Sequence, residues 1–400
     1  MKKQLIILLI LSSLVACSSN SNSQISSASN FSSETTSSSE PISSSEPTEP
    51  IEITINPIQD GFKPHSELVR NYFLSLNYDY KDMDPHVNAK IDQGDNLPIE
   101  ITWEAKNVPS NKQVEYIVMY TDGDKAITDV TSEQKYDLIN YKLNTFYNVN
   151  VAARVDGGEP EGLAEYRFKT PDGYVRTVTI DGVNNFRDLG DGKKIKQGLI
   201  YRSSTLTNNT AIDEDHPASI TEKGKVQLSR LGINTRIDLR KPEEIAESEE
   251  NVTAFVRNYP LYYGGQNILT YVGGEFNNPE NIKSIFNDLG DRGNYPLDIH
   301  CVRGTDRTGC IAYLIKGLMG VDEDMIYRDF LFSDFYNIGS PVKLESIYYE
   351  ANPNAVTRYV NVIKQTEGAT LKDKIFNYLT SNKVGVPADA LNNMMAILRA

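Results

Sequence analysis

The chain has 400 residues, of which 39% are hydrophobic, so it is long enough for two or three domains with ordinary packed cores. Its formal net charge is -14, and the sequence contains no block dense in lysine or arginine. Such a surface repels polyanions, and we therefore expect no nucleic-acid partner.

The N-terminus has the features of an export signal. Two lysines are followed by an apolar run from Leu5 to Leu11 and then by small residues. This run is short for a membrane span and is typical of a signal that is removed. Leu14 to Cys17 resembles the lipobox of bacterial lipoproteins, which implies that residues 1–17 are a lipoprotein signal peptide and that Cys17 is lipidated. The alternative is an ordinary cleaved signal with a chance cysteine.

Residues 18–50 contain fifteen serines in thirty-three positions. Such a segment cannot bury enough apolar surface to offset the entropy of ordering, so we expect a disordered tether. Together with the lipobox, it predicts an extracytoplasmic protein held at the cell membrane by its lipid anchor alone. Only Cys301 and Cys310 would remain besides Cys17, too few for a disulfide framework.

Residues 51–172 show apolar residues with a period of two, separated by turn residues, which predicts an antiparallel β-sandwich. Residues 51–80 are an extra strand or a linker. The stretch Leu143 to Val151, with Trp103 on an earlier strand, resembles a fibronectin type III domain, although the family's usual proline is replaced by Leu143. The module is either a spacer or a surface for adhesion or substrate presentation. The alternating residues are Ile99, Ile101, Trp103 and Ala105; Val114, Tyr116, Val118 and Tyr120; Tyr147, Val149 and Val151; and Tyr166 and Phe168.

Residues 173–400 alternate between strand and helix patterns, which predicts an α/β domain with a central, mainly parallel sheet flanked by helices. Residues 233–239 and 296–300 are predicted strands. After Thr308, apolar residues recur at helical spacing and form one stripe of a helix that ends near Gly320. These stripe residues are Ile311, Leu314, Ile315 and Leu318.

The loop between the second strand and this helix has the composition of an anion site. Successive N–H groups of residues 302–307 can curl around one point at the positive end of the helix. Gly304 allows the turn, and Arg307 offers a planar fork for two phosphate oxygens. The same dipoles favour the thiolate of Cys301, which could attack phosphorus, and Thr308 could donate a hydrogen bond to the sulfur.

Residues 300–309, His-Cys-Val-Arg-Gly-Thr-Asp-Arg-Thr-Gly, resemble the H-C-x5-R-[ST] loop of protein tyrosine phosphatases. This version is similar to that of bacterial tyrosine and dual-specificity phosphatases, some of which also act on phosphoinositides. The likeness extends over about 180–335 through the segments 185–190, 201–203, 237–240 and 329–333. It implies a phosphocysteine intermediate, no cofactor, and phosphate binding by Val302, Arg303, Gly304, Thr305, Asp306 and Arg307.

One position departs from that group, which commonly has lysine where this chain has Thr305. The lysine is associated with multiply phosphorylated lipid or inositol rings. Arg303 lies two positions earlier, on another part of the loop. We therefore expect a phosphotyrosine-type substrate, with inositol phosphates or phosphoinositides as the alternative.

The general acid has several candidates. Asp238 ranks ahead because it ends a predicted strand, where α/β sites gather. Asp306 would position water or Arg307, and Asp188 ranks third, as a partner for a neighbouring arginine.

The remaining polar residues have supporting or undecided roles. His300 is expected to bind the loop backbone. Arg202 and Arg240 either support the loop or form ordinary ion pairs, and Cys310 is a core residue or a redox partner of Cys301. Residues 257–280, rich in tyrosine and glycine, are a lid or a surface excursion. His65, His86 and His216 lack ligand-like spacing, so no metal site is expected.

Three functions are compatible with the sequence. The first is a metal-independent tyrosine phosphatase acting on phosphorylated peptides or small phosphomonoesters. The second keeps the chemistry but changes the substrate to inositol phosphates or phosphoinositides. The third is a cell-surface lipoprotein that binds phosphorylated ligands or mediates adhesion without turnover.

Overall fold

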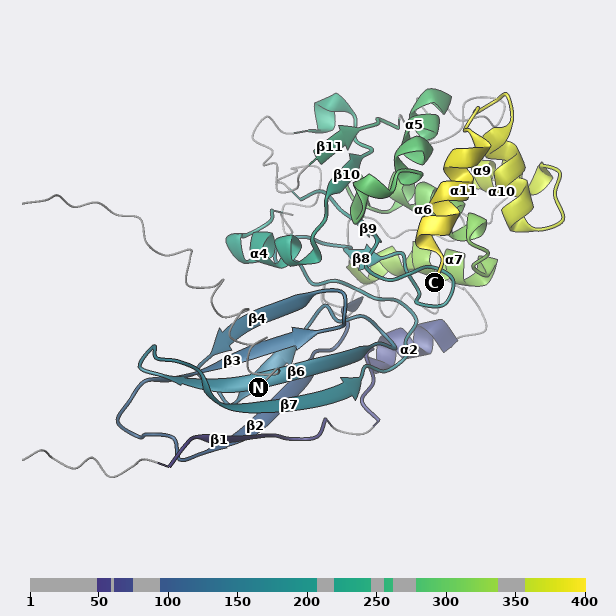
Figure 1. Ribbon diagram of the computed structural model, residues 1–400. Helices are drawn as coiled ribbons and strands as arrows, with labels where there is room; N and C mark the ends of the chain where they lie inside the picture. Colours follow the sequence, from purple (N-terminus) through teal and green to yellow (C-terminus); the bar gives the residue numbers. More distant parts are fainter. Residues whose placement is uncertain are drawn as a thin grey trace, which may run out of the picture. The chain divides into compact units, whose positions relative to one another are not determined.

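A computed structural model describes residues 49–58, 61–74, 94–206, 219–245, 255–261, 278–336 and 357–400 (Figure 1). The signal peptide, Cys17, nearly all of the tether, His86, His216 and most of the expected lid lie outside the described residues. Within the described ranges, no helix combines the length and apolar character needed to cross a membrane.

The N-terminal half contains two antiparallel sheets, here called the two-sheet module. One sheet has the order β1-β2-β5, with β1 at Glu52–Ile55, β2 at Ile99–Lys106 and β5 at Lys135–Leu138. The other has the order β4-β3-β6-β7, with β4 at Ala126–Thr131, β3 at Val114–Thr121, β6 at Phe146–Val155 and β7 at Glu161–Lys169. Both sheets contribute to one core, in which Ile101 and Trp103 of β2 lie with Tyr116 and Val118 of β3.

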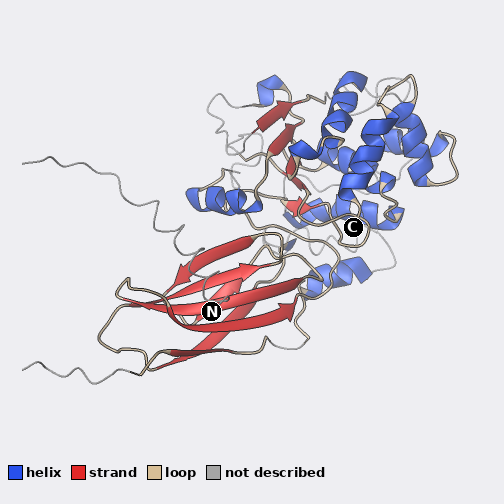
Figure 2. Ribbon diagram, viewed as in Figure 1, coloured by secondary structure: helices blue, strands red, loops and turns tan. Residues whose placement is uncertain are grey.

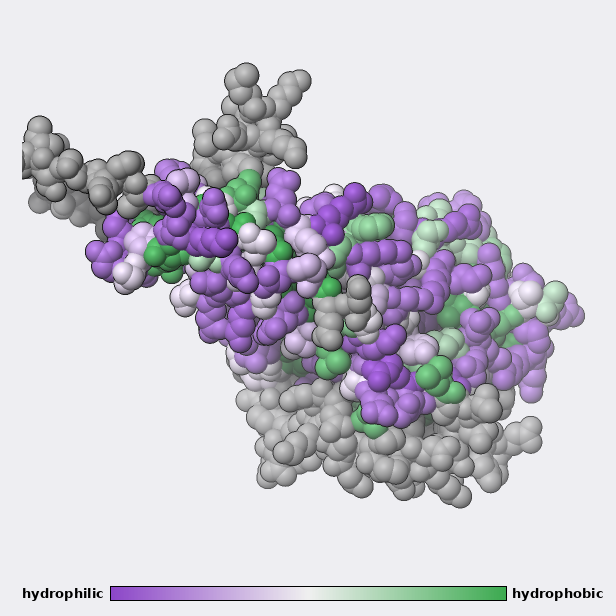
Figure 3. All heavy atoms as spheres, turned by 90° about the horizontal axis from the view of Figure 1, so that it is seen from below, coloured by the Kyte–Doolittle hydropathy of each residue, from purple (hydrophilic) through white to green (hydrophobic). Residues whose placement is uncertain are grey.

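The predicted alternation is present in β2, β3, β6 and part of β7, because one face of each strand is turned to that core. Strands β4 and β5 were not predicted. Most residues of β4 are only half-buried or exposed, so the strand carries no clear two-residue period. Figure 3 shows one face of the molecule, on which hydrophilic residues predominate and apolar ones form small separate groups.

The C-terminal half is built on a five-stranded sheet of order β11-β10-β12-β9-β8. Its strands are β8 (Arg187–Asp188), β9 (Ile200–Ser203), β10 (Thr235–Asp238), β11 (Phe255–Asn258) and β12 (Leu297–His300). Neighbouring strands from β11 to β9 are parallel, and β8 is antiparallel to β9. The mainly parallel sheet therefore agrees with the sequence prediction. The register places Asp238 beside His300, so the carboxyl ends of β10 and β12 meet at one edge.

Helices accompany this sheet, as Figure 2 shows in blue. They are α4 (Glu222–Leu231), α5 (Pro279–Leu289), α6 (Asp306–Leu318), α7 (Glu323–Leu331), α9 (Thr357–Gln365), α10 (Leu371–Thr380) and α11 (Ala388–Leu398). Short 3-10 turns lie at η3 (Pro242–Glu244), η4 (Arg292–Asn294) and η5 (Phe332–Tyr336).

Helix α6 is more deeply buried than a single apolar stripe predicts, since every residue from Arg307 to Leu318 is buried. It packs against α7 and α10 as well as the strands β9 and β12. Close packing depends on Gly309, where an added Cβ would lie 2.5 Å from the ring of Phe330. The stripe describes only one of several covered faces.

Helix α2 (Glu67–Leu74) breaks the expected boundary between residues 172 and 173. Its buried residues Val69, Tyr72 and Phe73 belong to the same core as α6 of the C-terminal half. The core of the two-sheet module contains none of these three side chains. An apolar helix face must be buried somewhere, and here the C-terminal half covers it.

Candidate functional site

Cys301 follows the central strand β12 directly and is 3% exposed. Residues 302–305 form a loop, and α6 begins at Asp306. Gly304 has a φ of 68°, and a Cβ there would lie 2.3 Å from the carbonyl oxygen of Ser203. Only glycine therefore fits this turn without displacing β9. The strand, loop and helix expected from the sequence are all present.

The loop is held from outside by its carbonyl groups. The N–H of residue i+1 points opposite to the C=O of residue i in a trans peptide. The carbonyl groups of residues 302–305 accept hydrogen bonds from donors outside the loop. The N–H groups of residues 303–306 therefore point away from those donors, toward the inner side of the loop, where an anion would be bound. The outer bonds run from Thr205 N to Val302 O (3.0 Å), from Asn185 Nδ2 to Arg303 O (3.0 Å), and from an Arg202 guanidinium nitrogen to Gly304 O (2.6 Å) and Thr305 O (3.3 Å).

A buried charge cluster stands behind the loop, centred on Asp329 of α7. Its two carboxylate oxygens accept from Arg187 Nε at 2.9 Å and from an Arg202 nitrogen at 3.0 Å, and Lys316 Nζ lies 3.3 Å away. Burial opposes ionisation of Asp329, but Arg187, Lys316 and Arg202 hold its pKa well below the ordinary value. Arg202 therefore takes both roles left open by the sequence, because it pairs with an acid and fixes the loop.

Arg307 lies at the first turn of α6 and is 2% exposed. Its terminal nitrogens bind Glu244 at 2.6 and 3.1 Å, and one also donates to Leu239 O at 3.2 Å. Burial raises the pKa of Glu244, whereas the bonds from Arg307 and the Lys241 backbone lower it, and the net shift is downward. Glu244 thus holds the planar guanidinium of Arg307 in a fixed orientation. This residue was not predicted from the sequence; it ends η3, the turn that follows β10 and Arg240.

Asp238 is locked in an ion pair and is 2% exposed. Arg240 binds it through Nε at 3.0 Å and a terminal nitrogen at 2.7 Å, and another nitrogen of Arg240 reaches Thr205 Oγ1 at 2.9 Å. Burial would raise the pKa of Asp238, but the guanidinium and the backbone N–H of Arg240 hold it below the ordinary value. A carboxyl that is ionised at neutral pH has no proton to give, so the site disfavours Asp238 as the general acid.

His300 is completely buried, and burial, together with Arg236 and Arg240, holds its pKa well below the ordinary value despite Asp238. Its Nε2 lies 2.8 Å from an Arg236 nitrogen. Because arginine only donates, this ring nitrogen accepts, and the ring is neutral with its proton on Nδ1. The charge that keeps Asp238 ionised is therefore that of Arg240.

Four further residues of the loop and helix were candidates from the sequence. Asp306, half-buried, is the first residue of α6 and directly precedes Arg307. Arg303 is also half-buried, and Thr305 is 3% exposed. The Oγ1 of Thr308 is buried and has no hydrogen-bond partner among the described residues, as expected of a donor that awaits sulfur or substrate.

The other candidates occupy structural positions. Asp188 accepts from Arg176 at 2.7 Å, in agreement with its ranking as an arginine partner. Cys310 lies in the core on α6 and forms no disulfide with Cys301. His65 is buried near Tyr174, whose backbone N–H donates to it at 3.0 Å. In the part of the chain that is described, no three His, Cys, Asp or Glu side chains are grouped to hold a metal ion.

Comparison with known proteins matches residues 178–400 to the model of the tyrosine phosphatase family. A protein of Cupriavidus necator named as a tyrosine-protein phosphatase is 26% identical over 190 residues, covering 40% of this chain and 64% of the relative. The triple specificity protein phosphatase PtpB of Mycobacterium tuberculosis is 25% identical over 210 residues, covering 39% of this chain and 68% of the relative. The chain thus spans about two thirds of the length of these curated relatives.

Two solved structures of the Siw14 catalytic core also match. One, from S. cerevisiae in complex with citrate, is described as a PP-IP phosphatase and is 18% identical, with a TM-score of 0.27 over 42% of this chain and 91% of that chain. The other is 16% identical, with the same TM-score of 0.27 over 42% of this chain and 83% of that chain. Likenesses at this level do not establish a shared fold.

Proposed function

Because this chain belongs to the tyrosine phosphatase family, to whose model more than half of its residues match, we propose that it hydrolyses phosphate monoesters through a phosphocysteine intermediate. One observation carries the proposal. The carbonyl groups of residues 302–304 are bound from outside, and that of Thr305 also accepts the α6 bond from Gly309 N, so the trans peptides turn the N–H groups of residues 303–306 toward the inner side of the loop. A tetrahedral dianion fits such a ring of donors at a helix N-terminus.

The reaction has two steps. The Cys301 thiolate attacks phosphorus, an S–P bond forms, and the P–O bond to the leaving group breaks while an acid protonates the departing oxygen. Water then attacks phosphorus, the S–P bond breaks, and inorganic phosphate leaves after the water proton passes to the same carboxylate. The loop N–H groups and Arg307 stabilise the charge on the transferring group in both steps. Thr308 would donate to the sulfur as it leaves.

We assign the acid and base role to Asp306 in place of Asp238. Asp306 is the first residue of α6, next to Arg307, and is half-buried, so it can meet both substrate and water. The carboxylate of Asp238 is ionised and paired with Arg240, and its side chain is buried away from solvent. This reverses the order that sequence position alone suggested.

The substrate is proposed to be a phosphotyrosine-type monoester. Thr305 brings no charge to the position where related phosphatases commonly have lysine, and its side chain is buried. A ring with several phosphates would therefore lack one of its cations. We expect the protein to release phosphate from phosphotyrosine peptides at least about tenfold faster than from inositol phosphates, measured as kcat/KM. Equal or faster release from inositol phosphates would establish the alternative substrate.

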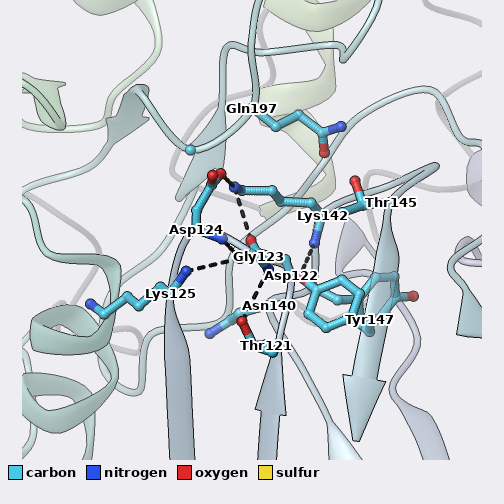
Figure 4. Close-up of polar contacts among 12 residues, drawn as sticks. Thr121, Asp122, Gly123, Asp124, Lys125, Asn140, Lys142, Thr145, Tyr147 and Gln197 are labelled. Carbon is cyan, nitrogen blue, oxygen red and sulfur yellow. Dashed lines mark hydrogen bonds and ion pairs between the residues drawn. The ribbon is translucent and has the colours of Figure 1, made fainter. Parts of the chain in front are cut away.

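The N-terminal regions support a surface-tethered lipoprotein. The two-sheet module is proposed to be fibronectin type III-like, because its strand order fits that sandwich and Tyr147 Oη accepts from the backbone N–H of Lys142 at 2.9 Å. This bond is drawn in Figure 4. Residues 1–17 with Cys17 are proposed to provide an extracytoplasmic lipid anchor. We expect Cys17→Ser to move the protein from the membrane fraction to the soluble fraction, and retention in the membrane would contradict the anchor.

A further inference from the structure

Helix α2 is joined to the charge cluster behind the loop by a reciprocal pair of hydrogen bonds. Tyr72 Oη donates to the carbonyl oxygen of Arg328 at 2.7 Å, and a guanidinium nitrogen of Arg328 donates to the carbonyl oxygen of Tyr72 at 2.7 Å. Both side chains are buried. Arg328 directly precedes Asp329, so these bonds fix the backbone that carries the central acid of the cluster.

From Asp329 the contacts continue to the loop without interruption. Arg202 binds Asp329 with one nitrogen and the carbonyl oxygens of Gly304 and Thr305 with the other. A shift of Asp329 would therefore move Arg202, and the peptides of residues 304 and 305 would turn with it. The orientation of the N–H groups inside the loop depends on these peptides.

A second connection starts in the two-sheet module. Arg176, 4% exposed, donates to the carbonyl oxygens of Asn140 at 2.6 Å and Tyr141 at 2.9 Å, and to the carboxylate of Asp188 at 2.7 Å. Asp188 is the residue after Arg187, which binds Asp329 from the other side. The turn at residues 140–141 thus anchors β8, and β8 anchors the cluster.

A further group of contacts between the described parts of the two halves lies around Lys142 and Gln197. Figure 4 shows Lys142 directed to Asp122 and Asp124, with Gln197 of the C-terminal half nearby. Gln197 pairs with the backbone of Leu143 through both ends of its amide, at 2.8 and 3.0 Å. A cavity of about 470 Å³ adjoins these residues, and its lining includes neither Cys301 nor Arg307. Arg230 and Asp129 form a half-exposed ion pair on the same side.

From these contacts we infer that α2 and the turn at residues 140–141 support the active site from outside, with Tyr72 and Arg176 as positioning residues for the phosphate-binding loop. This inference rests on the proposed phosphatase site and gives the module a role in addition to that of a spacer. A loop that must present several donors to one anion loses affinity when its supports loosen, because small displacements weaken several bonds together. The two-sheet module and α2 hold those supports in place.

The test compares Arg176→Met and Tyr72→Phe with Arg230→Met in the whole chain. Arg230→Met removes an arginine that pairs with Asp129 at the same interface, and the described residues show no contact from this pair to the loop. We measure orthovanadate affinity, kcat and KM for an aryl phosphate, and hydrogen exchange of residues 297–309. All measurements are made at a temperature where near-ultraviolet circular dichroism shows every variant folded.

Arg176→Met is expected to weaken orthovanadate binding about tenfold and to speed exchange of the loop amides, with Tyr72→Phe changing both in the same direction by a smaller factor. Arg230→Met should leave both within about twofold of the original protein. The inference fails if folded Arg176→Met or, should that variant not fold, Tyr72→Phe binds orthovanadate and exchanges its loop amides as the original does. If the original protein shows no turnover, the proposed function fails, while the exchange measurement still decides the inference.

Discussion

Cys301→Ser is expected to reduce phosphate release from an aryl phosphate by roughly four orders of magnitude or more, because a serine hydroxyl at neutral pH is a far weaker nucleophile than a thiolate. The substitution replaces one atom at the base of the loop and leaves the N–H groups and Arg307 in place. Orthovanadate and phosphate should therefore still bind noncovalently. The measurement is steady-state release of the aryl alcohol, together with a binding titration.

Cys310→Ala is the matched control. Its thiol lies in the core on α6, nine residues beyond the nucleophile, and we expect a modest loss of stability with turnover retained. If the original protein bound phosphate without releasing product, the chain would be a phospho-ligand binding protein of the third class considered above. If Cys301→Ser turned over as fast as an active original protein, Cys301 would not be the nucleophile.

Asp306→Asn is expected to lower kcat/KM by about 10²–10⁴-fold on phenyl or alkyl phosphates, since the asparagine cannot protonate the departing oxygen. The loss should be much smaller with a leaving group of low pKa, such as p-nitrophenolate, because that oxygen needs little help from an acid. The dependence of kcat/KM on leaving-group pKa is therefore the decisive measurement, because kcat also contains hydrolysis of the phosphocysteine. A flat dependence in the original protein that steepens in Asp306→Asn identifies the acid.

Asp238→Asn serves as the comparison. It leaves the buried Arg240 without its carboxylate, and breaking such a pair costs about 3–5 kcal/mol of stability. We expect a lower unfolding temperature but, in the folded fraction, an unchanged dependence on the leaving group. If Asp238→Asn instead steepened that dependence, the roles of the two aspartates would be reversed.

The loop was predictable because its chemistry is contained in consecutive residues. The spacing of Cys301, Gly304 and Arg307 between a strand and a helix already specifies a turn that exposes N–H groups at a helix N-terminus. The same holds for strands such as β2 and β3, whose alternation reflects one buried face. Patterns of this kind can be recognised in the sequence because they involve residues that are close together in the chain.

Partners that are distant in the chain were decided only by the tertiary structure. Nothing near Arg307 indicates that Glu244, far away in the chain, fixes the orientation of its guanidinium. Arg240 is close to Asp238 in the sequence, but only the fold shows that this pair is buried. Likewise, the apolar face of α2 predicts a helix that must be covered, but only the folded chain shows that the catalytic core covers it and that Tyr72 reaches Arg328. Charge and burial act through space, and a linear sequence does not record which residues the fold brings together.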